Sequence, residues 1–360
     1  MQYPGLMTDS FQIEIGFLAS LKVEMEKRNY NSIDLAKFFA AILVVAIHSR
    51  PFASNELADY FFTSFLRIAV PFFFVATGFF FFLKEKPDIR GYTKRLASLY
   101  VLWFIIEIYF VYLRFFVDYD HSLPMQLFNF FRCLLFSNTW YASWFIMACI
   151  IAVNIIYYLS RKLNNWQLLL VGFGAYLISL FCSSYSGVLD LVLNERFRYY
   201  HAAFSYLFMP ANSFIVAMVY IAIGKFIAED MVRDRKYSIS KPMNVGLLAL
   251  VTLSGCAEVL LIRWSVVIND AYLFLPFFTF FAFVLLLGVD VKIPAQVSKT
   301  LRSMSILIYI LHGIFVSVNP VLFGLESGMA MFGVTLLESV VWAFLIVMLS
   351  EKVPVLKMLY

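Results

Sequence analysis

Ten stretches of about twenty mostly apolar residues follow one another along the chain. A run of that length is what a helix needs to cross the hydrocarbon core of a bilayer. The runs are continuous and do not alternate with a period of two, so they predict helices and not the strands of a barrel. The ten windows are residues 33–52, 60–83, 96–117, 139–159, 166–184, 204–228, 243–263, 270–289, 303–323 and 329–349.

The composition excludes a soluble fold of the same length. Of the 360 residues, 62% are hydrophobic and 14% are charged, whereas a soluble domain is about half apolar and about a quarter charged. The formal net charge of +5 is spread over the loops and forms no basic patch, which excludes a nucleic-acid binder. The sequence therefore predicts an all-α, polytopic integral membrane helix bundle in contact with the lipid bilayer.

The distribution of Lys and Arg between the windows predicts the orientation. With the N-terminus in the cytoplasm, twenty basic residues fall in inner segments and six in outer segments. Two more, Lys37 and Arg67, lie farther inside their windows and are assigned to neither side. Such a bias is typical of cytoplasmic loops, so about ten transmembrane helices with both termini in the cytoplasm are expected. Residues 121–137 and 187–203 are too polar to span and are expected at the interface.

Three regions follow from this pattern. Residues 1–30 are predicted to be a disordered cytoplasmic extension, 31–350 the transmembrane domain and 351–360 a cytoplasmic tail. The four cysteines have no CxxC spacing, and no Cys or His spacing typical of a metal site occurs. We therefore expect buried free thiols and no metal.

Ionisable residues within the windows are the functional candidates. Each costs about 2.5–3.5 kcal/mol on insertion scales, so few are kept without a role. Those that we select as candidates are Asp34, Lys37, His48, Arg67, Glu107, Glu258, His312 and Glu338.

The first window carries two of them on one face. Eleven residues separate Lys37 from His48, which is close to three full turns and a rise of about 16 Å. Asp34 is within reach of a salt bridge to Lys37, and Ala41 and Val44 would form a narrow wall between the two polar groups. The alternative is a Lys that extends to the interface and a His hydrogen-bonded to a neighbouring helix.

Two segments resemble a known family. The run Asp34-Leu35-Ala36-Lys37-x10-His48, followed by Pro51-Phe52, resembles the first helix of the acyltransferase-3 family, in which the motif is Arg-x10-His. Lys37 keeps the charge of that arginine but loses its bidentate fork.

The second window continues the resemblance. The stretch Arg67 to Phe79 is similar to the family's Val-Pro-Phe-Phe-Phe-x-x-Ser-Gly-Phe segment, with Thr77 in the serine position. The strings Trp140-Tyr141-Ala142-Ser143-Trp144-Phe145 and Ile308-Tyr309-Ile310-Leu311-His312 are weaker landmarks.

The resemblance implies an enzyme that moves an acyl group, usually acetyl, from coenzyme A to a carbohydrate hydroxyl. The acceptor would be a cell-surface polysaccharide or its lipid-linked precursor, and the location the cell membrane. His48 would be the catalytic base, since imidazole titrates near neutral pH. Coenzyme A would be bound by Lys37, Arg67, Lys94 and Arg95, and the acceptor by Trp140 and His312.

Other interpretations of these residues stay open. Glu107 could pair with Arg67, and His312 could form a bond between helices. A transporter or flippase for a small polar solute or glycolipid would use the same polar face, although no inverted repeat or discontinuous helix is evident from the sequence. A non-catalytic assembly subunit is the third alternative.

Overall fold

The computed structural model describes residues 30–137, 139–266 and 270–360, and within these ranges it contains helices and no strand. The all-α prediction is confirmed there, while the predicted extension at residues 1–30 lies almost wholly outside the described residues. The main helices are α2 (Asn31–Ser49), α3 (Glu56–Leu66), α4 (Ala69–Phe82), α5 (Ile89–Ile106), α6 (Ile108–Tyr112), α7 (Leu123–Phe136), α8 (Ser143–Leu159), α9 (Asn165–Phe181), α10 (Ser186–Val192), α11 (Glu195–Phe208), α12 (Phe214–Phe226), α13 (Lys241–Leu261), α14 (Phe274–Leu287), α15 (Ala295–Phe323) and α16 (Met329–Leu349).

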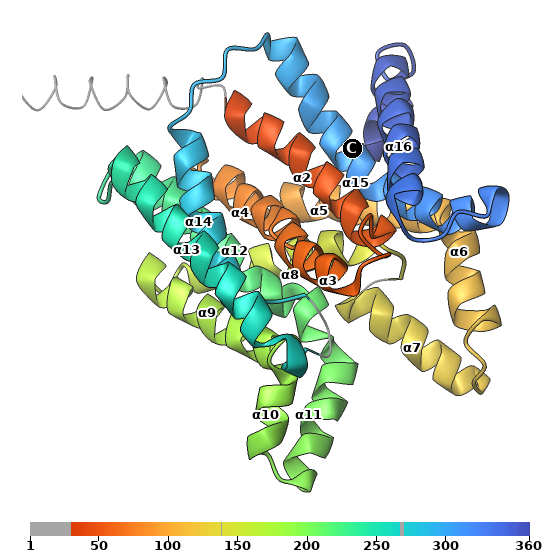
Figure 1. Ribbon diagram of the computed structural model, residues 1–360. Helices are drawn as coiled ribbons and strands as arrows, with labels where there is room; N and C mark the ends of the chain where they lie inside the picture. Colours follow the sequence, from red (N-terminus) through yellow and green to blue (C-terminus); the bar gives the residue numbers. More distant parts are fainter. Residues whose placement is uncertain (1–29, 138, 267–269) are drawn as a thin grey trace, which may run out of the picture.

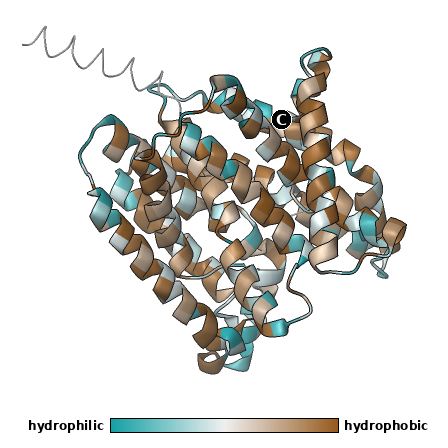
Figure 2. Ribbon diagram, turned by 45° about the horizontal axis from the view of Figure 1, so that its top comes forward, coloured by the Kyte–Doolittle hydropathy of each residue, from teal (hydrophilic) through white to brown (hydrophobic). Residues whose placement is uncertain are grey.

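Six of the described helical stretches are long and apolar enough to cross a membrane, or eight if each of two bent pairs is one span. The remaining two predicted windows contain α8 and α14, with 17 and 14 residues, which are short of the usual length. A count of ten spans therefore stays a prediction. Figure 2 shows hydrophobic residues over most of the bundle and hydrophilic residues gathered in connecting loops and at helix ends.

Helices α2 and α15 lie side by side and run in the same direction (Figure 1). Asp34 bonds Arg302 near their starts, and His48 stacks on His312 farther along both. We call the end near Asp34 the inner end and the opposite end the outer end. Phe80, near the end of α4, meets Lys37 near the start of α2, so α4 runs the opposite way. These relative directions match the predicted alternation; the side of the membrane stays a prediction.

Close backbone packing of α4 against α12 forms the centre of the bundle. A Cβ on Gly78 would lie 2.5 Å from the Ile221 carbonyl oxygen, and one on Gly224 would lie 2.3 Å from that of Val75. Neither position has room for a side chain. Since Gly78 faces α12, its neighbour Thr77 is free to face the other side of α4.

Two predicted spans are broken. Helix α5 bends by 73° into α6 and the following turn, and α9 bends by 82° into α10. Beyond these breaks, α7 and the α10–α11 pair project from the outer end of the bundle (Figure 1). This placement agrees with the expectation that residues 121–137 and 187–203 do not span.

Candidate functional site

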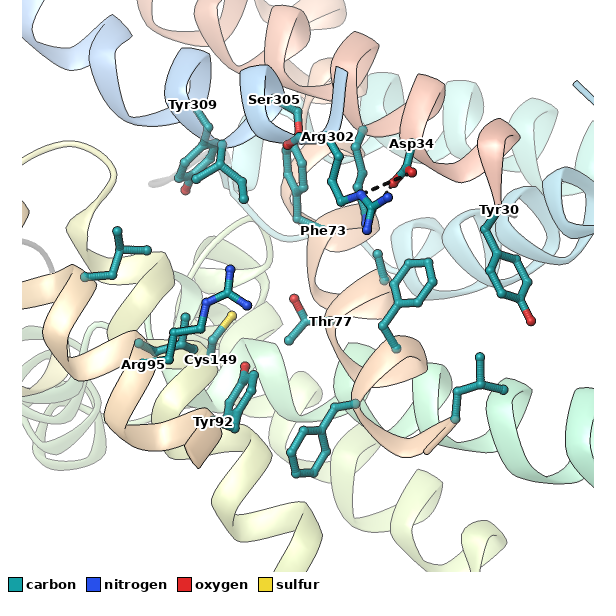
Figure 3. A pocket seen from close by; sticks show the side chains of 18 of the residues that line it. Tyr30, Asp34, Phe73, Thr77, Tyr92, Arg95, Cys149, Arg302, Ser305 and Tyr309 are labelled. Carbon is teal, nitrogen blue, oxygen red and sulfur yellow. Dashed lines mark hydrogen bonds and ion pairs between the residues drawn. The ribbon is translucent and has the colours of Figure 1, made fainter. Parts of the chain in front are cut away.

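A cavity of about 1390 Å³ opens at the inner end of the bundle. Five helices wall it: α2, α4, α5, α8 and α15. Figure 3 shows Arg95 and Arg302 reaching into it from α5 and α15, with Thr77 of α4 between them. The cavity is thus bounded by segments far apart in the sequence, which only the assembled bundle brings together.

The charged residues in the lining of the cavity are mostly basic. Its lining includes two acidic residues, Asp34 and Glu85, against six cationic ones. The six are Lys37, Lys84, Lys86, Arg95, Lys299 and Arg302. Cationic side chains that converge on a concave surface are suited to an anionic ligand, and the arginines add planar forks that fit phosphate oxygens.

Asp34 joins the inner ends of α2 and α15. Its carboxylate accepts a hydrogen bond from the Ser298 hydroxyl at 2.9 Å and lies 3.2 Å from the Arg302 guanidinium. It is also 3.6 Å from the Lys37 ammonium, which confirms the predicted salt bridge. The same ammonium sits 4.3 Å from the centre of the Phe80 ring. Lys37 is therefore held at the cavity wall by a carboxylate and an aromatic face.

Three aromatic rings line the cavity where it comes nearest to the histidines. Phe73 of α4, Phe145 of α8 and Tyr309 of α15 all line it, and each ring contacts the other two at centroid distances of 5.2–6.1 Å. Thr77 and Cys149 also line the wall. The cavity therefore changes from charged to apolar along its length, which suits a ligand with one anionic and one uncharged end.

Two histidines lie just beyond these three rings. The His48 and His312 rings stack at 5.0 Å with an angle of 28° between their planes. The Tyr141 ring meets His48 edge-on at 5.0 Å and packs so tightly on α15 that a Cβ on Gly313 would lie 2.7 Å from the Tyr141 Cβ. Trp140, a predicted acceptor residue, contacts Tyr141 at 5.3 Å. The structure thus brings His48, His312 and Trp140 into one cluster.

His312 is linked directly to the cavity wall. It is 1% exposed, and its Nδ1 lies 2.6 Å from the carbonyl oxygen of Tyr309. Its Nε2 is buried without a hydrogen-bond partner among the described residues. The predicted alternative, a hydrogen bond to another helix, is not formed there; the bond stays within α15.

Arg67 and Glu107 do not pair as one interpretation expected. Arg67 lies 2.6 Å from Asp270, which also accepts a hydrogen bond from Asn212 at 2.5 Å. Glu107 sits at the break between α5 and α6, is 2% exposed, and has a buried Oε1 without a partner in the described part of the chain. Asp270 is the first residue of the apolar window 270–289. An acidic residue at that position was the feature of the sequence from which its ion pair with Arg67 could have been predicted.

The predicted coenzyme A residues separate into two groups. Lys37 and Arg95 line the cavity, whereas Lys94 and Arg67 do not. Lys299 and Arg302 were not predicted to bind coenzyme A, although both come just before the ninth apolar window, which begins at residue 303.

Two further polar residues have local roles. Glu338 of α16 accepts a hydrogen bond at 2.8 Å from Asn319 of α15. Glu258 accepts bonds from the backbone N–H groups of Leu273 and Phe274, at the start of α14. A carboxylate there satisfies free donors and opposes the positive end of the helix. Both residues therefore join helices rather than line the cavity.

The fold and the site define a multi-helix membrane protein with a basic cavity that is lined at one end by aromatic rings, with a pair of histidines beside them. A family model described as an acyltransferase domain matches residues 30–350. The chain therefore belongs to the acyltransferase-3 family, as its motifs indicated.

The curated relatives carry other names. An amino-acid racemase of Enterococcus faecalis is 26% identical over 348 residues, which is 92% of this chain and 48% of that protein. Another amino-acid racemase of that organism is 30% identical over 222 residues, which is 59% of this chain and 30% of that protein. A serine/alanine racemase of Enterococcus gallinarum is 26% identical over 295 residues, which is 78% of this chain and 40% of that protein. This chain spans less than half the length of these relatives. No solved structure matches it.

Proposed function

We propose that this acyltransferase moves an acetyl group from acetyl-coenzyme A to a hydroxyl of a cell-surface polysaccharide or its lipid-linked precursor. It would act as a multi-pass protein of the cell membrane. The observation that carries the proposal is the cavity, whose basic part opens at the inner end and whose apolar end stops beside the histidine pair.

The chemical gradient of the cavity matches the donor. Coenzyme A has its phosphates at one end and its thioester at the other. Arg95 and Arg302 supply the bidentate forks that Lys37 lacks. The uncharged pantetheine arm then extends along Thr77 toward Phe73 and the other rings. Ala41 and Val44, predicted to wall this path, are buried between helices and do not line the cavity.

His48 acts as the base in this proposal. It removes the proton of the acceptor hydroxyl as the oxygen attacks the acyl carbon, and the thiolate of coenzyme A departs. A positioned base contributes about 10²–10⁴-fold in rate. The acceptor approaches from the outer end, where Trp140 packs on Tyr141 and the Tyr141 ring contacts both histidines.

Binding and turnover of acetyl-coenzyme A test the proposal directly. Purified protein in detergent is titrated with acetyl-coenzyme A by calorimetry, and release of coenzyme A to water is followed as slow hydrolysis. We expect saturable binding and release above a protein-free control. Absence of binding at millimolar concentration contradicts the proposal.

The two broken helices favour one other function, a transporter. Discontinuous spans form solute sites in many transporters, and Glu107, with its buried Oε1, lies at one break. Because the relatives are named amino-acid and serine/alanine racemases, the solute would be serine or alanine. Uptake of labelled serine into proteoliposomes, together with no binding of coenzyme A, would favour the transporter.

A further inference from the structure

The two stacked histidines are held in different ways. The Nδ1 of His312 lies 2.6 Å from the Tyr309 carbonyl oxygen. A carbonyl oxygen can only accept, so Nδ1 carries the hydrogen, and in the neutral ring Nε2 keeps a free lone pair. That Nε2 is buried and has no partner among the described residues. A buried polar atom left unpaired is unfavourable, so it points to a partner supplied by a ligand.

His48 has no such orientation. Within the described ranges no hydrogen bond fixes its ring, which is half-buried against the rings of His312 and Tyr141. Because the two imidazoles are nearly parallel, an N–H in the plane of one ring does not point at a nitrogen of the other. The two histidines are therefore suited to act on different groups rather than to pass a proton between them.

Their surroundings assign them to different substrates. His312 is bonded to Tyr309, whose ring lines the cavity and lies 6.1 Å from the His312 ring. His48 does not line the cavity, and its ring meets Tyr141, the neighbour of Trp140, at 5.0 Å, closer than the His312 ring at 6.0 Å. His312 is thus the histidine nearer the donor cavity, and His48 is the one nearer the proposed acceptor residue Trp140. Acyl transfer breaks the C–S bond of the thioester and none of its C–H bonds, so the role open to a bare ring nitrogen beside the acyl carbon is nucleophilic attack.

We propose that His312 is a catalytic nucleophile that carries the acyl group between donor and acceptor; this inference rests on the proposed acyltransferase function. After the Tyr309 side chain turns aside, the lone pair of Nε2 attacks the thioester carbon. The C–N bond forms, the C–S bond breaks, and coenzyme A leaves as the thiolate, while Nδ1 keeps its hydrogen. The product is an acyl-imidazolium on His312.

The second half of the reaction restores the enzyme. His48 takes the proton of the acceptor hydroxyl, the oxygen bonds to the acyl carbon, and the C–N electron pair returns to Nε2. His48 then releases that proton to water, and the thiolate takes one from water, so the whole reaction yields an ester and a thiol. Burial of His312 at 1% exposure protects the acyl-imidazolium from water. Donor and acceptor can therefore use the site in turn, from opposite ends.

An exchange assay isolates the first step. Labelled coenzyme A is incubated with unlabelled acetyl-coenzyme A and detergent-purified protein, without acceptor, and label in acetyl-coenzyme A is measured. Exchange requires a reversible acyl-enzyme. We expect exchange in the wild type and in His48→Ala, and at least a hundredfold loss in His312→Asn. The asparagine can still donate to the Tyr309 carbonyl but has no atom at the Nε2 position.

Controls separate the possible outcomes. His201→Asn changes an α11 histidine that contacts the Phe181 carbonyl far from the cavity, and it should exchange like the wild type. Binding of acetyl-coenzyme A by His312→Asn shows that this variant is folded. Exchange by His312→Asn at the wild-type rate, or hydrolysis without exchange in the wild type, overturns the nucleophile and leaves the acyltransferase standing. Failure of the wild type to bind acetyl-coenzyme A contradicts the proposed function itself.

Discussion

The two ends of the α2–α15 pair differ in chemistry although the same two helices form both. At the inner end, Asp34 and Arg302 form an ion pair beside an open basic cavity. Toward the outer end, His48 and His312 stack as rings among aromatic side chains, and His312 is almost fully buried. Fixed charges stand where water and an anionic ligand can reach, while groups able to be neutral stand where a charge would be costly.

This difference suggests a division of labour between the ends. Ion pairs at a cavity mouth hold a phosphate-bearing ligand, and a buried imidazole provides a base or nucleophile in a site that excludes water. If the division is correct, changes at the outer end should alter turnover and leave binding intact. Changes at the inner end should do the reverse.

The largest effect is expected at the outer end. His48→Ala removes the proposed base and should lower hydrolysis of acetyl-coenzyme A by about 10²–10⁴-fold. The dissociation constant should stay unchanged, because His48 does not line the cavity. Calorimetry and a thiol-release assay on the same preparation separate the two quantities. Wild-type turnover in this variant would contradict the proposed division of roles between the two ends.

A smaller effect is expected at the inner end. Arg95→Ala removes a guanidinium that reaches into the cavity and should weaken acetyl-coenzyme A binding about 10- to 100-fold, since hydrogen bonds to charged groups contribute about 1.5–3 kcal/mol. Lys94→Ala, the adjacent change outside the cavity lining, is the matched control and should bind normally. Equal loss in both variants would indicate a general charge effect and not a site.

The smallest effect is expected from the ion pair that joins the helices. Asp34→Asn weakens contacts to Arg302 and Lys37; the Arg302 side chain is 55% exposed, so its contact contributes at most about 1 kcal/mol, and the asparagine oxygen can still accept from Ser298. We expect a less than about fivefold change in turnover and a slightly lower melting temperature. Asp234→Asn, in a surface ion-pair group, is the control. Loss of turnover as large as that of His48→Ala would mean that Asp34 belongs to the reacting groups.

Spacing along the sequence predicted the contacts that form between residues of one helix. The Asp34–Lys37 salt bridge follows from a separation of three residues and is present. The parallel course of α2 and α15 agrees with the predicted alternation. The motif segment 67–79 also had a physical meaning: Gly78 permits the close approach of α12, and Thr77 is thereby turned toward the cavity.

Contacts between distant segments could not be predicted in this way. Arg67 pairs with Asp270, two hundred residues along, because the bundle places the start of α4 beside the segment before α14. Arg302 enters the cavity only because α15 packs on α2. Hydropathy also gave no sign of the break at Glu107, since both halves of that span are apolar. Spacing within one helix is local, whereas pairing across helices depends on packing.

Blocking the cavity while leaving the histidines untouched tests the central claim most directly. Thr77 lines the cavity from α4 across from Arg95, and a tryptophan there would fill part of the cavity. Calorimetric titration with acetyl-coenzyme A should show at least a tenfold loss of affinity in Thr77→Trp, and wild-type affinity in the conservative control Thr77→Ser. Full affinity in Thr77→Trp, with the protein folded, would contradict the assignment of this cavity to the acyl donor.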